Sequence, residues 1–203
     1  TRVETSLREE TKSGQPRILF QPGAGLPERC WPVPKFAELA ERLMDEIGAQ
    51  IIVHCGPNEE HLGQRIHEAV PKPIILARRL TLQELAALLT QCDLLVSNDS
   101  GPMHLAAAVG VPIVAIFGPT DPRRSGPFAA EAEIVTHSLD CSPCGVKQFA
   151  CLERECLSEI SVGEVHQAAN GKEGLDALNQ HWVDLVIVDI NMPVLNGEEM
   201  IDR

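Results

Sequence analysis

The sequence contains no tyrosine, and aromatic residues of all kinds make up only 3% of its 203 residues. A folded core must therefore be built mainly from Leu, Ile, Val and Ala side chains. Basic residues are also scarce, since 17 Lys and Arg stand against 29 Asp and Glu and give a formal net charge of −12. This acidic balance argues against nucleic acid or an anionic membrane as partner, although a local phosphate site remains compatible with it.

Long hydrophobic runs are missing as well. The longest apolar stretch, around residues 105–117, is interrupted by Gly110 and Pro112, so we expect no transmembrane segment. No secretory signal is visible. The seven cysteines are an odd number, which favours reduced thiols over a disulfide framework and predicts a cytoplasmic location.

From Arg17 onward, short apolar runs alternate with amphipathic segments. We predict strands over residues 17–21, 50–54, 73–76, 93–97, 112–117 and 133–136, and helices over residues 34–47, 59–69, 82–91 and 102–109. This alternation predicts an α/β fold with a Rossmann-like, mainly parallel sheet covered on both faces. Ligands of such sheets bind beyond the carboxyl ends of the strands, where the loops at Gly23, Gly56, Asp99 and Gly118 are expected to lie.

Two places carry the pattern of a capping box, in which Ser or Thr precedes Glu by three residues. Thr81 with Glu84 begins one predicted helix, and Ser161 with Glu164 predicts another that runs toward Ala169. Beyond it we predict a helix over residues 172–180 and a strand over residues 185–188.

The segment Ser97–His104 has the pattern of a strand end, a polar turn and a helix start. Asp99 and Ser100 are expected to cap a helix that begins at Gly101-Pro102, because their side-chain oxygens can accept from its unpaired amides. Such a helix start can hold a phosphate, and Gly101 allows a close approach. An ordinary β-α-β unit with a well-capped helix explains this segment equally well.

The run Asp99-Ser100-Gly101-Pro102-Met103-His104 resembles the Asp-Ser/Thr-Gly-x-x-His element of glycosyltransferase family 9, the heptosyltransferases of lipopolysaccharide assembly. Two further pieces resemble that family in the same order: Phe20–Gly25 with Trp31-Pro32 and Phe36–Ala40, and Cys141–Cys144 with Cys151 and Cys156. The resemblance runs from about Ile18 to Val165. It implies the C-terminal half of a GT-B fold, which binds a nucleotide-sugar, with ADP-heptose as the expected donor substrate.

The resemblance also implies which residues bind the donor. They are Gly23, Ala24, Gly25, Arg29, Asp99, Ser100, Gly101, Pro102, His104, Gly118 and Thr120. Backbone amides of the Gly23–Gly25 loop can donate to a phosphate, Arg29 stands where the family usually has a lysine, and His104 is implied to donate to the diphosphate. A surface cation at Arg29 and a helix-packing histidine at position 104 are the alternative interpretations.

Sugar transfer also needs a general base near the acceptor hydroxyl. The resemblance implies that this base belongs to an N-terminal acceptor-binding domain that is missing from this sequence, and Asp99 is not assigned that role. We therefore leave the catalytic residues unassigned. The chain is expected to bind a nucleotide-sugar without turnover on its own, and to require no cofactor or metal.

The cysteines at 141, 144, 151 and 156 raise the possibility of zinc, because Cys-x-x-Cys is a common half-site. The second pair is spaced more widely than in a standard zinc ribbon. Reduced thiols in a surface loop are therefore the favoured interpretation, and metal analysis would decide between the two.

A second resemblance begins near Ala168. The runs Ala168–Leu175 and Asp184–Pro193, followed by Asn196-Gly197, are similar to the middle of a response-regulator receiver domain, which has a flavodoxin-like fold. It implies Asp189 as a phosphoacceptor. Because the acidic pair, hydroxyl residue and lysine of that family are absent, Asp189 is expected to be inert, and Mg²⁺ would matter only to a functional receiver.

Together these patterns predict three parts: a linker or tail over residues 1–16, a nucleotide-sugar-binding domain over residues 17–166, and a partial receiver fragment over residues 167–203. The alternative is a non-enzymatic chimeric or signalling module, in which the receiver piece only completes the fold. Nucleotide binding that depends on Asp99 or His104 would separate these two hypotheses.

Overall fold

The computed structural model describes residues 14–129, 131–144, 151 and 154–169. Within them, one six-stranded sheet has the order β3-β2-β1-β4-β5-β6, with every neighbouring pair parallel. The strands are β1 (Arg17–Gln21), β2 (Gln50–His54), β3 (Ile75–Ala77), β4 (Leu94–Asn98), β5 (Ile113–Phe117) and β6 (Ala132–Thr136). The order reverses between β1 and β4, as in a Rossmann fold, so the predicted architecture is confirmed.

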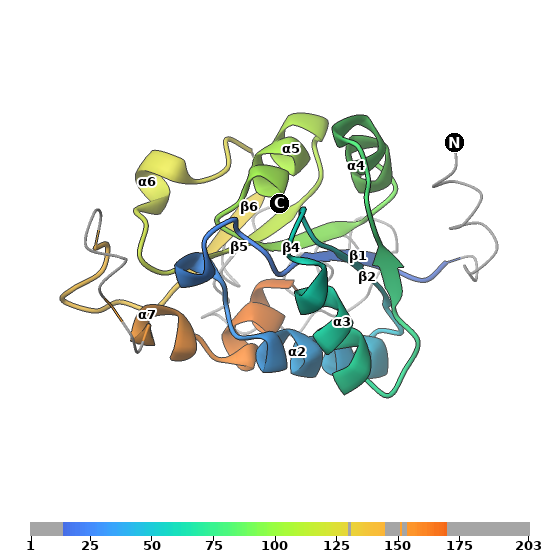
Figure 1. Cartoon of the computed structure of the whole chain (residues 1–203), viewed down its shortest axis with the longest axis horizontal. Helices are drawn as coiled ribbons and strands as arrows, with labels where there is room; N and C mark the ends of the chain where they lie inside the picture. The colour runs from blue at the N-terminus through green and yellow to red at the C-terminus, as the bar shows by residue number, and fades with distance from the viewer. Residues whose placement is uncertain (1–13, 130, 145–150, 152–153, 170–203) are drawn as a thin grey trace, which may run out of the picture.

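Helices cover both faces of this sheet (Figure 1). They are η1 (Pro27–Arg29), α2 (Val33–Glu46), α3 (Glu60–Ala69), α4 (Leu82–Leu89), α5 (Gly101–Val109), α6 (Pro122–Ser125) and α7 (Glu155–Ser158), followed by helical residues 162–169. The predicted strands and the four predicted helices that precede residue 110 are present, with ends shifted by at most two residues. The short helices η1, α6 and α7 were not predicted, because segments of three or four residues carry no helical period.

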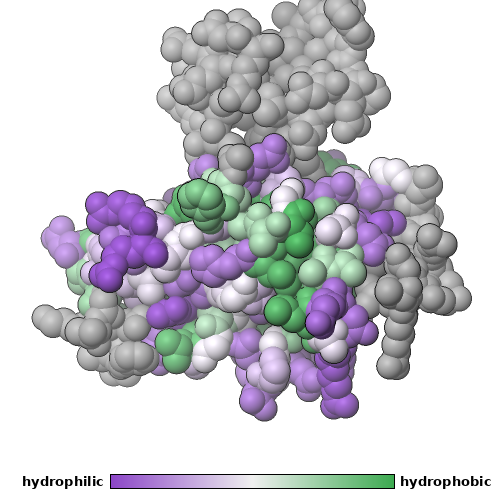
Figure 2. Space-filling view, turned by 90° about the horizontal axis from the view of Figure 1, so that it is seen from above, coloured by the Kyte–Doolittle hydropathy of each residue, from purple (hydrophilic) through white to green (hydrophobic). Residues whose placement is uncertain are grey.

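Strand residues alternate between two hydrophobic clusters, one on each face of the sheet. Ile18 and Phe20 of β1 join the cluster under α2, whereas Leu19 joins the cluster under α4 and α5. Strands β4 and β5 are buried along their whole length, as central parallel strands should be. Figure 2, seen from the side of α4 and α5, shows hydrophobic surface over these helices bordered by hydrophilic side chains.

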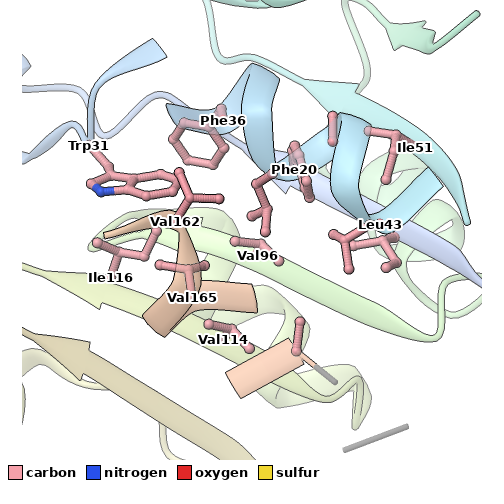
Figure 3. Packing of buried hydrophobic residues seen from close by; sticks show 14 of the residues in the cluster. Phe20, Trp31, Phe36, Leu43, Ile51, Val96, Val114, Ile116, Val162 and Val165 are labelled. Carbon is pink, nitrogen blue, oxygen red and sulfur yellow. The ribbon is translucent and has the colours of Figure 1, made fainter. Parts of the chain in front are cut away.

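The described C-terminal segment packs on the same face as α2 (Figure 1). Val162 and Val165 lie beside Ile116 of β5 in Figure 3, and Ala169 still belongs to that cluster. Trp31 Nε1 donates to the Ile160 carbonyl at 3.1 Å, which fixes the start of this segment. Residues up to 169 therefore share one core with the sheet.

Both predicted capping boxes are confirmed. At α4, the Glu84 amide donates to Thr81 Oγ1 at 3.2 Å, and the Thr81 amide donates to Glu84 Oε2 at 2.8 Å. At residues 162–169, the reciprocal bonds join Ser161 and Glu164 at 3.2 and 2.7 Å.

Several predictions fall outside the described residues. They are most of the tail over residues 1–16, the helix over residues 172–180, the strand over residues 185–188, and Asp189. Among the residues that the structure does describe, no helix is long and apolar enough to cross a bilayer.

Candidate functional site

The candidate site begins where β1 and β4 end side by side. Gln21 is paired with Ser97, so the loop after β1 and the turn after β4 are neighbours at the point where the strand order reverses. Asn98, fully buried, ties the two together. Its Nδ2 donates to the Pro22 carbonyl at 2.8 Å, and its Oδ1 accepts from the Trp31 amide at 3.0 Å.

Asp99 brings three of the predicted site residues together. Its Oδ2 accepts from Arg29 Nη1 at 3.1 Å and from Thr120 Oγ1 at 2.8 Å. The Asp99 side chain is only 6% exposed and that of Arg29 is 27% exposed, so this is a largely buried, charge-assisted contact. Arg29 is therefore no simple surface cation. Its Nε is buried without a hydrogen-bond partner, which leaves one donor unused.

The predicted capping of α5 by Asp99 and Ser100 is wrong. Ser100 is the N-cap residue, but its side chain makes no capping bond; its Oγ instead lies 2.9 Å from Ser97 Oγ. The Asp99 side chain does not cap the helix either, because it is directed toward Arg29. Ser100 thus bonds within the turn and Asp99 bonds to residues of two other segments, so the first-turn amides of α5 are left without a side-chain cap.

The space in front of α5 is open. Pro102 lies in the first turn as predicted, and a Cβ added at Gly101 would meet no heavy atom within 4 Å. His104 is exposed, which contradicts the helix-packing interpretation. An open helix start with no capping side chain is a suitable place for a phosphate.

The loop at Gly23–Gly25 binds an oxyanion, but that oxyanion comes from the protein itself. The amides of Ala24 and Gly25 donate to Glu59 Oε1 at 3.0 and 2.7 Å. A Cβ at Gly23 would lie 2.1 Å from Glu59 Oε2, so a larger residue there would push the carboxylate away from its present position. The predicted donors exist, and Glu59 occupies them.

A buried pair supports this loop from below. His54 Nδ1 lies 2.7 Å from Gln21 Oε1, which accepts, so the ring carries its proton on Nδ1. Gln21 Nε2 in turn donates to the Gly23 carbonyl at 3.4 Å. Burial lowers the pKa of His54 and outweighs the opposite effect of the Glu59 carboxylate, so the neutral ring is favoured.

The loop Gly118–Thr120 is held from outside by the cysteine-bearing segment. Ser142 Oγ donates to the Gly118 carbonyl at 2.6 Å, and the Cys144 amide donates to the Pro119 carbonyl at 2.9 Å. A Cβ at Gly118 would lie 2.5 Å from Leu157 Cγ. Gly118 is thus required by packing, and the loop it begins carries Thr120 to Asp99.

Four positioning residues of this site were not predicted: Asn98, Glu59, Gln21 and His54. A polar residue at the end of a buried strand was the available signal for Asn98 and His54. For Glu59 the signal was its place just after the Gly56 loop, which was expected in the same crevice. In the part of the chain that the structure describes, no group of three or more His, Cys, Asp or Glu residues could hold a metal ion.

Sequence and structure comparisons place the chain among known proteins. The model of "Glycosyltransferase family 9 (heptosyltransferase)" matches residues 2–153. Lipooligosaccharide heptosyltransferase 2 of Haemophilus influenzae is 36% identical over 127 residues, which cover 60% of this chain and 36% of that protein. Lipopolysaccharide heptosyltransferase 2 of Escherichia coli is 35% identical over 129 residues, which cover 61% of this chain and 37% of that protein. The chain therefore spans little more than a third of these relatives.

Solved structures agree with this match. The structure of E. coli ADP-heptose lps heptosyltransferase II superposes with a TM-score of 0.70 at 28% identity, covering 81% of this chain and 48% of that one. A family 9 glycosyl transferase from Veillonella parvula gives the same TM-score at 31% identity, covering 84% and 49%. A response regulator receiver domain model matches residues 148–203, most of which lie outside the described part. The chain belongs to glycosyltransferase family 9, the heptosyltransferase family.

Proposed function

We propose that this chain is the donor-binding half of a heptosyltransferase of lipopolysaccharide core synthesis, and that it holds the diphosphate of ADP-heptose in front of β1 and β4. The observation that carries the proposal is the Asp99 carboxylate, which fixes Arg29 and Thr120 beside the uncapped start of α5. A cation and a hydroxyl are then held beside helix amides that no side chain caps.

These groups suit a departing nucleoside diphosphate. In the transfer, an acceptor hydroxyl oxygen forms a bond to the anomeric carbon, the bond from that carbon to the diphosphate oxygen breaks, and a base removes the hydroxyl proton. Negative charge accumulates on the diphosphate. Arg29, the first-turn amides of α5 and His104 stabilise that charge, since fixed donors aimed at a developing anion lower the barrier.

Glu59 sets a condition on this binding mode. A phosphate can take the Ala24 and Gly25 amides only after the Glu59 carboxylate has left them. Two anions on the same donors would repel each other. The diphosphate is therefore proposed to bind first at α5 and Arg29, with the Gly23–Gly25 loop as a second contact.

The chain alone is proposed to bind the donor without transferring the sugar. It covers only 36% and 37% of two heptosyltransferases that it matches, and we assign no residue of the described site as the general base. Asp99 is engaged by two donors and serves as a positioning residue. Sugar transfer by the purified chain would contradict this part of the proposal.

Calorimetric titration of ADP, and then of UDP, into the purified chain tests the site. Saturable ADP binding that Asp99→Ala removes is the expected result, and preference for ADP over UDP would support an adenine-linked donor. Asp121→Asn is the matched control, because the hydrogen bonds that the Asp121 side chain makes within the described residues all go to Arg123, and the substitution should leave binding unchanged. Absence of binding by either nucleotide would favour a scaffold without a donor site.

The receiver match at residues 148–203 supports a second candidate, a phosphorylatable signalling module. Acetyl phosphate with Mg²⁺ should then label Asp189, and Asp189→Asn should abolish the label. We expect no label, because the acidic pair and the lysine that neutralise the transferring phosphoryl group are missing from the sequence.

A further inference from the structure

The loop after β1 is built to bind an anion, and its present occupant belongs to the protein. The consecutive amides of Ala24 and Gly25 both donate to Glu59 Oε1, at 3.0 and 2.7 Å. Gly25 has a φ of +70°, in the left-handed region. Successive N–H groups that converge in this way form an anion-binding concavity called a nest. Residues 23–25, the nest of this chain, therefore hold one carboxylate where a phosphate oxygen would fit equally well.

Glu59 reaches the nest instead of its own helix. It stands at the N-cap position of α3, where its side chain makes no capping bond. A carboxylate at a helix start is ordinarily stabilised by the amides of that helix. Here a tight turn directs it elsewhere, because Asn58 has a φ of +68° and the Glu59 amide donates to the Gly56 carbonyl at 3.1 Å. The local backbone thus favours the contact with the nest.

Backbone amides, rather than a basic side chain, hold this carboxylate. Among the described residues, no Lys, Arg or His forms an ion pair with Glu59. The Glu59 side chain is half-buried and Gly25 is exposed, so solvent borders the contact. A second anion can reach the nest from this side, but the negative charge of Glu59 repels it for as long as the carboxylate stays.

We propose that Glu59 is a specificity-determining residue, an internal competitor that keeps a single free phosphate out of the nest and yields to a diphosphate. This role rests on the proposed function, because one phosphate of the ligand must be held at α5 and Arg29. The residues at which the two loops begin, Gln21 and Ser97, are paired in the sheet, so both contacts belong to neighbouring loops.

Tethering explains the discrimination. Glu59 is joined to the nest through the chain, and short tethers give an effective concentration of about millimolar. A free phosphate competes with it only at its bulk concentration. The second phosphate of an anchored diphosphate is tethered as well, so it competes with Glu59 on equal terms.

Titration of orthophosphate into the ¹⁵N-labelled 203-residue chain tests the competitor directly. The readout is the chemical shift of the Ala24 and Gly25 backbone amides, measured by nuclear magnetic resonance. In the unmodified chain these resonances should stay in place. In Glu59→Ala they should move and saturate, with phosphate affinity raised at least tenfold. Glu59→Gln should lie between the two, because its side chain keeps one acceptor oxygen and loses the charge.

Glu60→Gln is the matched control for Glu59→Gln. It changes the net charge by the same amount at the next residue, and the Glu60 carboxylate pairs with Arg79 at 3.4 Å instead of entering the nest. Its response to orthophosphate should equal that of the unmodified chain. The dispersion of the remaining amide resonances shows whether each variant is folded, and Glu59→Gln, which keeps the side-chain length, is the mildest change.

Two results would overturn the competitor: equal responses to orthophosphate in the unmodified chain and Glu59→Ala, or no response in either Glu59 variant. Pyrophosphate tests the other half, since it should move the Ala24 and Gly25 resonances of the unmodified chain but not those of Asp99→Ala. No pyrophosphate response in the unmodified chain would show that Glu59 does not yield to a diphosphate. If ADP binding fails, the proposed function falls, yet entry of orthophosphate only after substitution of Glu59 would still establish the competitor.

Discussion

Helices α4 and α5 lie next to each other on the same face of the sheet, yet their first turns are built in different ways (Figure 1). Thr81 and Glu84 close the start of α4 with two reciprocal hydrogen bonds. At α5 the corresponding Ser100 turns away to Ser97, and no side chain caps the helix. One helix start is satisfied by its own sequence, and the other keeps its donors available for a ligand.

The loop after β1 is intermediate between the capped start of α4 and the uncapped start of α5. Its amides at Ala24 and Gly25 are satisfied, but by the Glu59 carboxylate, which lies on another element and can be displaced. The amide donors at the carboxyl ends of the strands are therefore of three kinds. Those at the start of α4 are closed by a cap, those of the loop after β1 are exchangeable because Glu59 can leave them, and those at the start of α5 are open. A set that is open in the folded state costs stability, and a ligand can recover that cost.

The largest expected effect is at the centre of the open site. Asp99→Ala should weaken ADP binding by roughly 100-fold, because Arg29 and Thr120 lose the carboxylate that positions both of them. Calorimetry gives the affinity. Arg29→Lys should lose less, since it keeps the charge and loses the planar fork. If Asp99→Ala bound ADP as well as Asp121→Asn does, the ligand would not lie at this turn.

At the exchangeable loop the main effect should fall on stability. Gly23→Ala places a methyl group 2.1 Å from Glu59 Oε2, so the carboxylate must leave both amides. Because the clash is with the far end of a flexible side chain, Glu59 can turn away, and we expect the free energy of unfolding to fall by only about 1 kcal/mol for the two lost hydrogen bonds. Urea denaturation measures it. Glu59→Gln keeps the side-chain volume and one acceptor oxygen, so it should lower the free energy of unfolding by less. An equal loss in Gly23→Ala and Glu59→Gln would show that the charge of Glu59, rather than its position, stabilises the loop.

The contrast between α4 and α5 can itself be tested with a pair of substitutions. Thr81→Ala should lower stability by about 1 kcal/mol and leave ADP affinity unchanged, because it removes a helix cap that follows the edge strand β3 rather than β1 or β4. Gly101→Ala should do the reverse. Its methyl group meets no protein atom, so stability is kept, but it stands where a phosphate approaches and should weaken ADP binding about tenfold. Loss of stability in Gly101→Ala would mean that the α5 turn is closed.

The fold was predictable because its signals are local. Runs such as Leu94–Val96 and the helical spacing of Phe36, Leu39 and Leu43 fix elements without reference to the rest of the chain. The positions of Asp99, Arg29 and Thr120 in the site came from resemblance to a family. Their mutual contact joins residues 21 and 70 positions apart, and no local pattern carries it.

The details that sequence reasoning misassigned or missed also depend on contacts between different segments of the chain. Ser100 has the residue type of a good cap, but tertiary contacts with Ser97 outweigh that propensity. Glu59 lies 35 positions from Ala24, so its role depends on how α3 docks beside the β1 loop.

The smallest expected effect is on the pH dependence of stability, through the Gln21–His54 pair that supports the Gly23–Gly25 loop. Burial lowers the pKa of His54 in the folded chain, whereas the unfolded chain keeps the ordinary value of 6.5. As the pH falls below about 6.5, the unfolded state therefore binds the proton first, and stability decreases with decreasing pH. His166, whose pKa is also lowered, contributes in the same direction. His54→Gln should flatten the stability profile below pH 6.5, measured by urea denaturation. A slope unaffected by His54→Gln would mean that His54 is equally protonated in both states, and that the loop after β1 rests on Glu59 alone.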